Sequence, residues 1–240
     1  SFETPPCGEC AGGSPAESYS DNNSVPFNPW YRYGYSQSLY PGIALSGADT
    51  IRGISFRTSS SSTMSRNLTI AMANTSLTAL SESSYVASSD LTTVAANVTV
   101  DFSVAGWVYI PFSTPFVYDG RSNVVVAVTN NTGQYQNFYF YQHTSDVGNS
   151  VYWYQDDSAV NPVSPNAENS GVMDNVPDIR FDVICEPAEC TAPVIAVAGA
   201  DIDYIEIVWM PTGAESSWVT GYKTENETSW TDEAVGDISY

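Results

Sequence analysis

Apolar and polar residues alternate over much of the chain between residues 50 and 184. Ile54, Phe56 and Thr58 share one face of an expected strand, and Ser55 and Arg57 lie on the other. The same period of two predicts inward faces at Leu68, Ile70 and Met72, at Val98, Val100 and Phe102, and at Val108, Ile110 and Phe112. The best helical candidate is a weak pattern over 84–92. We therefore expect an all-β fold.

The second half of this region continues the pattern and adds aromatic residues. Pro115 is expected to end one strand, and the next, over 124–128, is apolar at every position, as in a central strand covered on both faces. Aromatic-rich strands are predicted over 138–142 and 151–155, followed by a long polar loop over 156–177 that contains three prolines. Short strands separated by polar turns favour a β-sandwich or jelly roll.

The chain divides by composition into four parts. Residues 1–17 form a Pro/Gly-rich arm, 18–184 the sandwich, 185–190 a cysteine-containing linker and 191–240 the start of a second β-domain. The last part has Pro193 near its start and alternates at Ile205, Ile207 and Trp209.

The net charge of −20 arises from few cations, because only seven residues are Lys or Arg. Such a surface repels phosphate backbones and anionic headgroups, so we expect no nucleic-acid partner. No run of about 18 apolar residues occurs, so we expect no membrane insertion. Abundant Ser, Thr, Asn and Tyr fit an extracellular, secreted or surface-attached protein.

The four cysteines form two close pairs, Cys7 with Cys10 and Cys185 with Cys190. An even number fits disulfides in an oxidising compartment, with the three possible connectivities left open. The spacing of the first pair also occurs in redox motifs, but its Pro/Gly-rich setting favours a structural disulfide. A four-cysteine zinc site would need both pairs together in a reducing compartment, and it ranks lower.

Candidate catalytic chemistry is sparse. His143 is the single histidine, and no Gly-x-Ser-x-Gly motif accompanies it, so a Ser-His-Asp triad is disfavoured. Asp156 and Asp157 are adjacent on an extended chain and point apart, which makes them a poor acid/base pair for glycoside hydrolysis. We expect no enzyme and no required cofactor.

Two sets of residues are candidates for binding. The carboxylates of Asp156, Asp157, Asp174 and Asp178 suit a structural Ca²⁺, which accepts oxygen ligands from loops. The aromatic rings of Tyr139, Tyr141, Tyr152, Trp153 and Tyr154 suit sugar recognition, because ring faces stack on sugar C–H groups. The alternative is that these rings belong to the core, and alternation alone places about half of them there.

Residues 191–240 resemble the opening of a fibronectin type III domain. The resemblance rests on Pro193, the strand 205–209 (IEIVW) and the segment from Trp218 to Tyr222. It implies that Trp209 packs in a core. Because half of such a sandwich leaves open edges, we expect the natural polypeptide to continue beyond Tyr240.

Residues 18–184 are similar to a jelly-roll-like β-domain of secreted and surface proteins of the Bacteroidota. The similarity is carried by the segments YRYGYSQSLY (31–40), IRGISF (51–56), AGWV (105–108), TPFVYDG (114–120), NVVVAV (123–128) and PDIRF (177–181). It implies an accessory module in adhesins and multidomain hydrolases. Thr50 and Ser158 fit the short O-glycosylation motif of that group.

These observations predict a non-catalytic adhesion or carbohydrate/protein-binding segment of a larger bacterial surface protein. Its partners would be a glycan, or a protein on a host or neighbouring cell, together with other domains of the same polypeptide. Two alternatives remain open: a spacer or filament subunit of a surface appendage, and an accessory module of a secreted peptidase or glycosidase.

Overall fold

A computed structural model describes residues 12, 24–45, 48–59, 63, 65–144 and 148–185, together with four strands further on. The chain divides into two compact units, one of which spans Cys10–Glu186. In the other, β12 (Val194–Ala200) pairs antiparallel with β13 (Ile205–Met210), and β14 (Trp218–Tyr222) pairs antiparallel with β15 (Thr231–Val235). Apart from Gly12, the predicted arm over 1–17 lies outside the described residues, as does the linker beyond Cys185.

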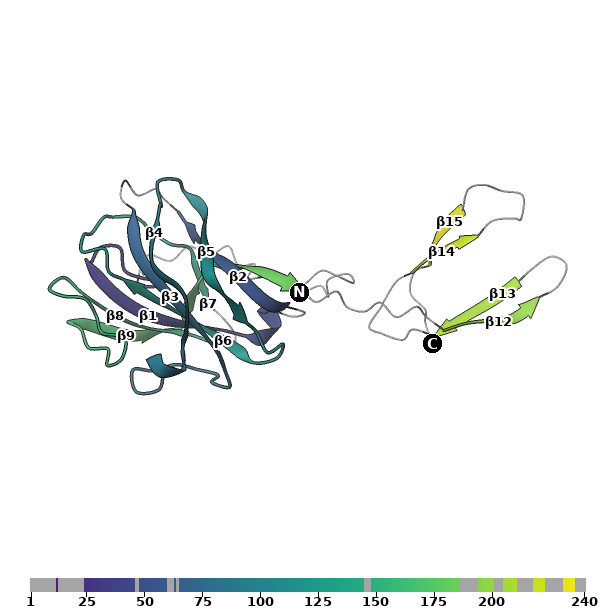
Figure 1. The fold of residues 1–240 in the computed structure, drawn as a ribbon, viewed down its shortest axis with the longest axis horizontal. Helices are drawn as coiled ribbons and strands as arrows, with labels where there is room; N and C mark the ends of the chain where they lie inside the picture. The colour runs from purple at the N-terminus through teal and green to yellow at the C-terminus, as the bar shows by residue number, and fades with distance from the viewer. Residues whose placement is uncertain are drawn as a thin grey trace. The chain divides into compact units, whose positions relative to one another are not determined.

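The Cys10–Glu186 unit is a β-sandwich, which confirms the all-β prediction (Figure 1). Its large sheet has the order β4-β3-β6-β1-β8-β9, from β1 (Tyr33–Tyr40), β3 (Arg66–Thr75), β4 (Thr92–Val100), β6 (Asn123–Asn130), β8 (Ser150–Gln155) and β9 (Asn169–Met173). The small sheet has the order β11-β2-β5, from β2 (Ala48–Thr58), β5 (Gly106–Val117) and β11 (Ile179–Cys185). A further pair joins β7 (Gln142–Thr144) to β10 (Asn175–Pro177).

The main core contains apolar side chains from both of these sheets. The predicted inward faces of β2 and β3 are confirmed, because Ile54, Phe56, Leu68, Ile70 and Met72 are at most 1% exposed. The opposite residues of β2, Ser55 and Arg57, are half-exposed, as the alternation requires. Each sheet therefore contributes one apolar face to this core.

A second core lies on the other face of the large sheet. It contains the alternate residues of the same strands, including Val125 and Ala127 of β6, so β6 is covered on both sides as predicted. The cover comes from the connections over 76–91 and 156–168, which contribute Leu80, Val86 and Val160.

Two amide side chains, that of the buried Gln37 and that of the half-buried Asn149, hold the connection over 76–91 to the sheet. Gln37 of β1 bonds both backbone groups of Val86, with Nε2 donating to the carbonyl (2.7 Å) and Oε1 accepting from N–H (2.9 Å). Asn149 bonds both backbone groups of Leu80 in the same way, with Nδ2 donating to the carbonyl (2.8 Å) and Oδ1 accepting from N–H (2.6 Å). Each amide replaces the two backbone bonds that an additional strand would make.

Several sequence predictions about local structure are wrong. The region 156–177, predicted as one loop, contains β9 and β10. Strand β5 continues through Pro115 to Val117, which is possible because β5 is an edge strand, where a missing N–H leaves no partner unsatisfied. The region 84–92 contains only the short 3-10 helix η2 (Ser88–Asp90), and a second one, η1 (Gly42–Leu45), was not predicted. The strand predicted over 138–142 begins only at Gln142.

We expect Phe27→Ala to lower the free energy of unfolding by about 3–5 kcal/mol, because it removes a buried ring and leaves a cavity. Phe27 is 1% exposed, and its ring makes edge contacts with those of Phe102, Phe138 and Phe140. Urea unfolding measures the change. Val163, which is 73% exposed, provides the control: Val163→Ala should change stability by less than about 0.5 kcal/mol. Equal effects of the two substitutions would contradict the assignment of Phe27 to the core.

The buried hydroxyl of Tyr35, in the second core, should make the unit less stable at alkaline pH. Burial raises the pKa of its hydroxyl to about 12, whereas the unfolded chain loses this proton near pH 10. Between these values the unfolded state binds fewer protons, so stability falls as pH rises. We expect Tyr35→Phe to remove about 2–3 kcal/mol of this loss, measured by urea unfolding from pH 9 to 12. Tyr135→Phe, at a 61% exposed position, should leave the slope unchanged.

Candidate functional site

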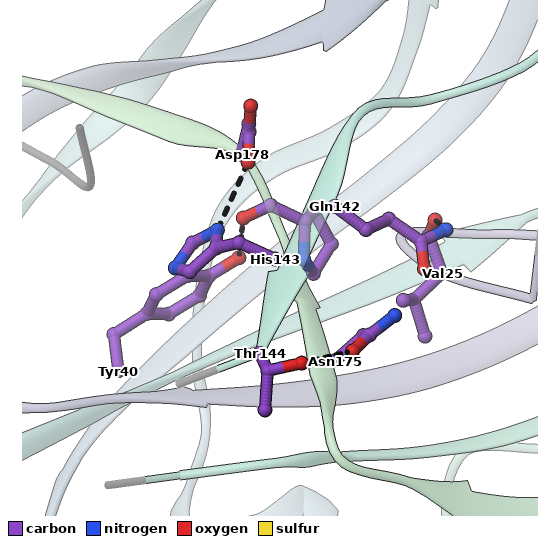
Figure 2. A network of polar contacts seen from close by, with 8 residues as sticks. Val25, Tyr40, Gln142, His143, Thr144, Asn175 and Asp178 are labelled. Atoms are coloured by element: carbon purple, nitrogen blue, oxygen red, sulfur yellow. Dashed lines mark hydrogen bonds and ion pairs between the residues drawn. The ribbon is translucent and has the colours of Figure 1, made fainter. Parts of the chain in front are cut away.

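The single histidine belongs to a buried polar network around strands β7 and β10. His143 Nδ1 and Asp178 Oδ1 are 2.9 Å apart (Figure 2). Asp178 is fully buried, and 12% of the His143 side chain is exposed. The Asp178 backbone N–H donates to the Tyr141 carbonyl at 2.9 Å, and the Tyr40 hydroxyl donates to the Pro177 carbonyl at 3.0 Å. Burial raises the pKa of Tyr40 well above its ordinary value, and the neighbouring charge of Asp178 raises it further.

Two further side-chain hydrogen bonds connect β7 to its neighbours. Gln142 Nε2 donates to the Val25 carbonyl at 2.9 Å, and the Thr144 hydroxyl donates to Asn175 Oδ1 at 2.9 Å. Figure 2 shows these residues around His143. A Ser-His-Asp triad would need a hydroxyl on the second imidazole nitrogen. Among the described residues, the side chain of His143 bonds only to Asp178. The contact therefore holds β7 to the start of β11.

The four calcium candidates lie in different surroundings. Asp156 follows β8 and accepts from the backbone N–H of Arg32 at 3.0 Å, and its neighbour Asp157 is exposed. Asp174 is exposed between β9 and β10, whereas Asp178 is buried against the histidine. Within the described part of the chain, no three His, Cys, Asp or Glu side chains come together as a metal site. Calcium binding stays a prediction from the sequence.

The five candidate aromatic rings are divided among four places. Trp153 is 4% exposed in the second core, where it stacks on Tyr35 with ring centres 5.8 Å apart and meets the edge of Tyr85. Tyr139 contacts the edge of Trp30, a ring that is 47% exposed. Tyr141 lies beside the small sheet, where its ring contacts Arg57 of β2. Only Tyr152 and Tyr154 remain together.

Tyr152 and Tyr154 form an aromatic cluster with Tyr31. The first two rings are nearly parallel, with centres 5.5 Å apart and planes 12° apart, and Tyr31 lies 4.4 Å from Tyr154. All three are half-buried. The pKa of Tyr31 is raised by burial and by the nearby Tyr154, Glu168 and Asp156. Carboxylates beside these rings disfavour an anionic ligand here.

The outer face of the small sheet carries a different set of planar groups. We call it the arginine–aromatic face, and it consists of Arg57, Trp107, Tyr109, Tyr141 and Arg180. Cross-strand pairing brings these residues together: Arg57 faces Trp107, and Ser55 of the central strand lies between Tyr109 and Arg180. Outward positions of a sandwich are usually small and polar, so large rings and guanidinium groups here are unusual.

Cation–π contacts order the centre of this face. The Arg180 Cζ atom lies 4.1 Å from the Trp107 ring centre. The Arg57 Cζ atom lies 5.9 Å from the same ring centre. Arg57 Cζ is 4.3 Å from the ring centre of Tyr141. Arg180 is exposed and forms no ion pair with the described residues. Such contacts contribute about 0.5–1 kcal/mol each at exposed sites and hold the guanidinium groups in place.

Tyr109 extends the face along the sheet. A Cβ atom at Gly53 would lie 2.5 Å from the Tyr109 hydroxyl and 2.7 Å from Cζ, so the ring crosses directly over the glycine backbone. Its hydroxyl donates to Asp182 Oδ2 at 2.7 Å, and Arg52 donates to Oδ1 at 2.9 Å. The hydrogen bond from Tyr109 and the contact with Arg52 lower the pKa of Asp182. Half of the Tyr109 surface remains exposed.

Sequence reasoning missed most of this face. Arg57, Tyr109 and Arg180 each occupy the polar side of a strand, where a charged or large residue raises no signal by itself. One feature of the sequence could have indicated the face. The chain has only six arginines and a net charge of −20, yet three of the six lie in β2 and β11. Only the pairing of these strands with β5 shows that they share a surface.

The remaining candidates concern modification. Thr50 lies half-exposed in β2, and Ser158 is exposed after β8, where its hydroxyl accepts from Gln155 Nε2 at 3.1 Å. Cys185 ends β11, whereas Cys7, Cys10 and Cys190 lie outside the described residues. Disulfide pairing and glycosylation both stay predictions.

We expect His143→Ala to lower the free energy of unfolding by about 3–5 kcal/mol, because it leaves the buried Asp178 without its partner. Urea unfolding at neutral pH measures this change. The double variant His143→Ala with Asp178→Asn should recover part of the loss, since the remaining side chain carries no charge. A loss below about 1 kcal/mol for the single variant would contradict this role.

Comparisons with known proteins found no match. No family model, no curated protein and no solved structure matches this chain. Its similarity to secreted Bacteroidota modules and to fibronectin type III domains therefore stays a prediction from the sequence. Among the described elements, no helix is long and apolar enough to cross a membrane.

Proposed function

We propose that the Cys10–Glu186 unit is a non-catalytic binding module of a secreted bacterial surface protein, and that the arginine–aromatic face binds a carboxylate-bearing glycan. The observation that carries the proposal is the ordered layer of rings and guanidinium groups on the outer face of β11-β2-β5. The proposal covers this unit, and other domains of the same polypeptide would supply further activities.

The chemistry of the face fits both parts of an acidic sugar. The Tyr109 ring crosses the Gly53 backbone and is half exposed, so it offers a flat surface for sugar C–H groups. Arg180 is exposed beside it and offers a planar fork of N–H donors that matches a carboxylate. A guanidinium stacked on Trp107 loses less side-chain freedom on binding than an unrestrained one.

Charge complementarity favours an anionic ligand at this face over the Tyr31–Tyr152–Tyr154 cluster. The chain as a whole carries a net charge of −20 and repels anions. At and beside the face, Arg52, Arg57 and Arg180 accompany one described carboxylate, that of Asp182, so the described charges here are mostly positive. Interactions between exposed charges decay over about 8–10 Å at physiological salt, so this local excess acts on a bound ligand.

The non-catalytic part of the proposal is supported by the setting of the titratable groups. His143 bonds to a buried carboxylate, and its side chain bonds to no hydroxyl of the described residues. On the proposed binding face, Asp182 is held by Tyr109 and Arg52. Among the described residues, no second carboxylate accompanies Asp182, as glycoside hydrolysis would require.

A matched pair of ligands tests the proposal: polygalacturonate and its methyl ester, which lacks the charge. We expect the full chain to bind the first and to bind the ester at least about tenfold more weakly. Trp107→Ala and Arg180→Ala should each weaken binding to polygalacturonate by about tenfold in affinity electrophoresis or calorimetry, because central Trp and Arg contacts contribute more than about 1 kcal/mol.

Trp30→Ala is the control, because Trp30 is a half-exposed tryptophan outside the face, and it should leave binding unchanged. Loss of binding in Tyr154→Ala together with full binding in Trp107→Ala would move the site to the tyrosine cluster and overturn the assignment. Binding to acidic proteins but to no acidic glycan would overturn the ligand class.

A further inference from the structure

Arg66 is a fully buried cation at the start of β3. Its side chain has no exposed surface. Nη1 donates to the backbone carbonyl of Gln134 at 2.8 Å, and Cζ lies 5.3 Å from the ring centre of Phe138. Nε and Nη2 have no acceptor among the described residues. Most of the donor capacity of this guanidinium is therefore unused in the interior of the unit.

Asn130 adds another unused donor. It ends β6 and is fully buried. Its Oδ1 accepts from the backbone N–H of Thr132 at 3.2 Å and from the Thr132 hydroxyl at 2.5 Å. These bonds fix which end of the amide faces the turn. The Nδ2 group then points away from it and has no partner among the described residues.

Strand register brings the two side chains together. Asn130 pairs with Leu68, two residues after Arg66 on the same strand, so Arg66 and Asn130 are diagonal neighbours. Side chains at i and i+2 share a face, and Leu68 belongs to the main core. Diagonal neighbours lie about 7–8 Å apart at the backbone, within reach of a long side chain. The N–H of Asn67 donates to the Thr132 hydroxyl oxygen at 3.0 Å and holds the turn against β3.

The charge of Arg66 needs compensation. Burial lowers its pKa to about 10, with no carboxylate contributing, so the group remains protonated at neutral pH. A buried charge is strongly unfavourable unless it is paired. The available groups, Arg66 Nε, Arg66 Nη2 and Asn130 Nδ2, are all donors. A partner for them must therefore be an acceptor, and a negative charge would satisfy it best.

We propose that Arg66 and Asn130 form a buried binding site for a small inorganic anion of halide size, held by Arg66 Nε, Arg66 Nη2 and Asn130 Nδ2. A halide accepts from several directions and needs no donor in return, which matches a set made only of donors. It also neutralises the guanidinium, as a water molecule does not. The bound ion joins the start of β3 to the end of β6 and so stabilises the folded unit.

The proposal predicts that halide concentration controls the stability of this unit. With ionic strength held constant by gluconate, a tenfold rise in chloride above its dissociation constant should lower the unfolding constant about tenfold. Hydrogen exchange of peptides from β3 and β6 in the full chain reads this out locally. Crystals soaked in bromide should show an anomalous peak beside Arg66 and Asn130.

Two variants and one control separate ion binding from general salt effects. Asn130→Asp places a carboxylate beside the guanidinium, so it should abolish the chloride dependence and retain the fold. Arg66→Met should also abolish it. Arg32→Met, at an exposed arginine, should keep the dependence of the wild-type chain. Equal stability of the wild-type chain in chloride and gluconate, or water alone at the bromide position, would overturn the proposal.

Discussion

Strand β6, at the centre of the large sheet, is apolar on both faces over 124–128, and both faces must be removed from water. Residues 124–128 of β6 contribute alternately to the main core and to the second core. A sandwich of two sheets covers only one of these faces. The other is covered by the connections over 76–91 and 156–168, which contribute apolar side chains and little regular structure. The unit thus has three layers, of which the third is made of loops.

Irregular backbone packed on a sheet needs partners for its own polar groups, and amide side chains in β1 and just before β8 supply some of them. Gln37 and Asn149 each bond both backbone groups of one residue in the connection over 76–91. The same need accounts for the network around His143 and Asp178, where side chains bond to neighbouring backbone and to one another. Arg66 and Asn130 differ, because their remaining donors meet no acceptor within the described chain.

The small sheet differs from the large sheet, because only its inner face packs in a core. Its outer face is therefore available for other groups, and it carries the rings and guanidinium groups of the arginine–aromatic face. These groups lie on strands whose inward residues, such as Ile54 and Ile110, are at most 1% exposed. A well-packed strand fixes its outward side chains in position, so the proposed ligand face rests on a rigid support.

The sequence alone determined what is local. Alternation at Ile54, Phe56 and Thr58 identified an inward face, and the unbroken apolar run over 124–128 identified a central strand, because burial selects side chains residue by residue. Tertiary structure decided what depends on neighbours distant in the chain. Trp153 is a core residue because the connection over 76–91 covers it, and Pro115 remains in a strand because β5 lies at an edge. Arg57 and Arg180 share a surface only because β2 pairs with β11, which no local pattern specifies.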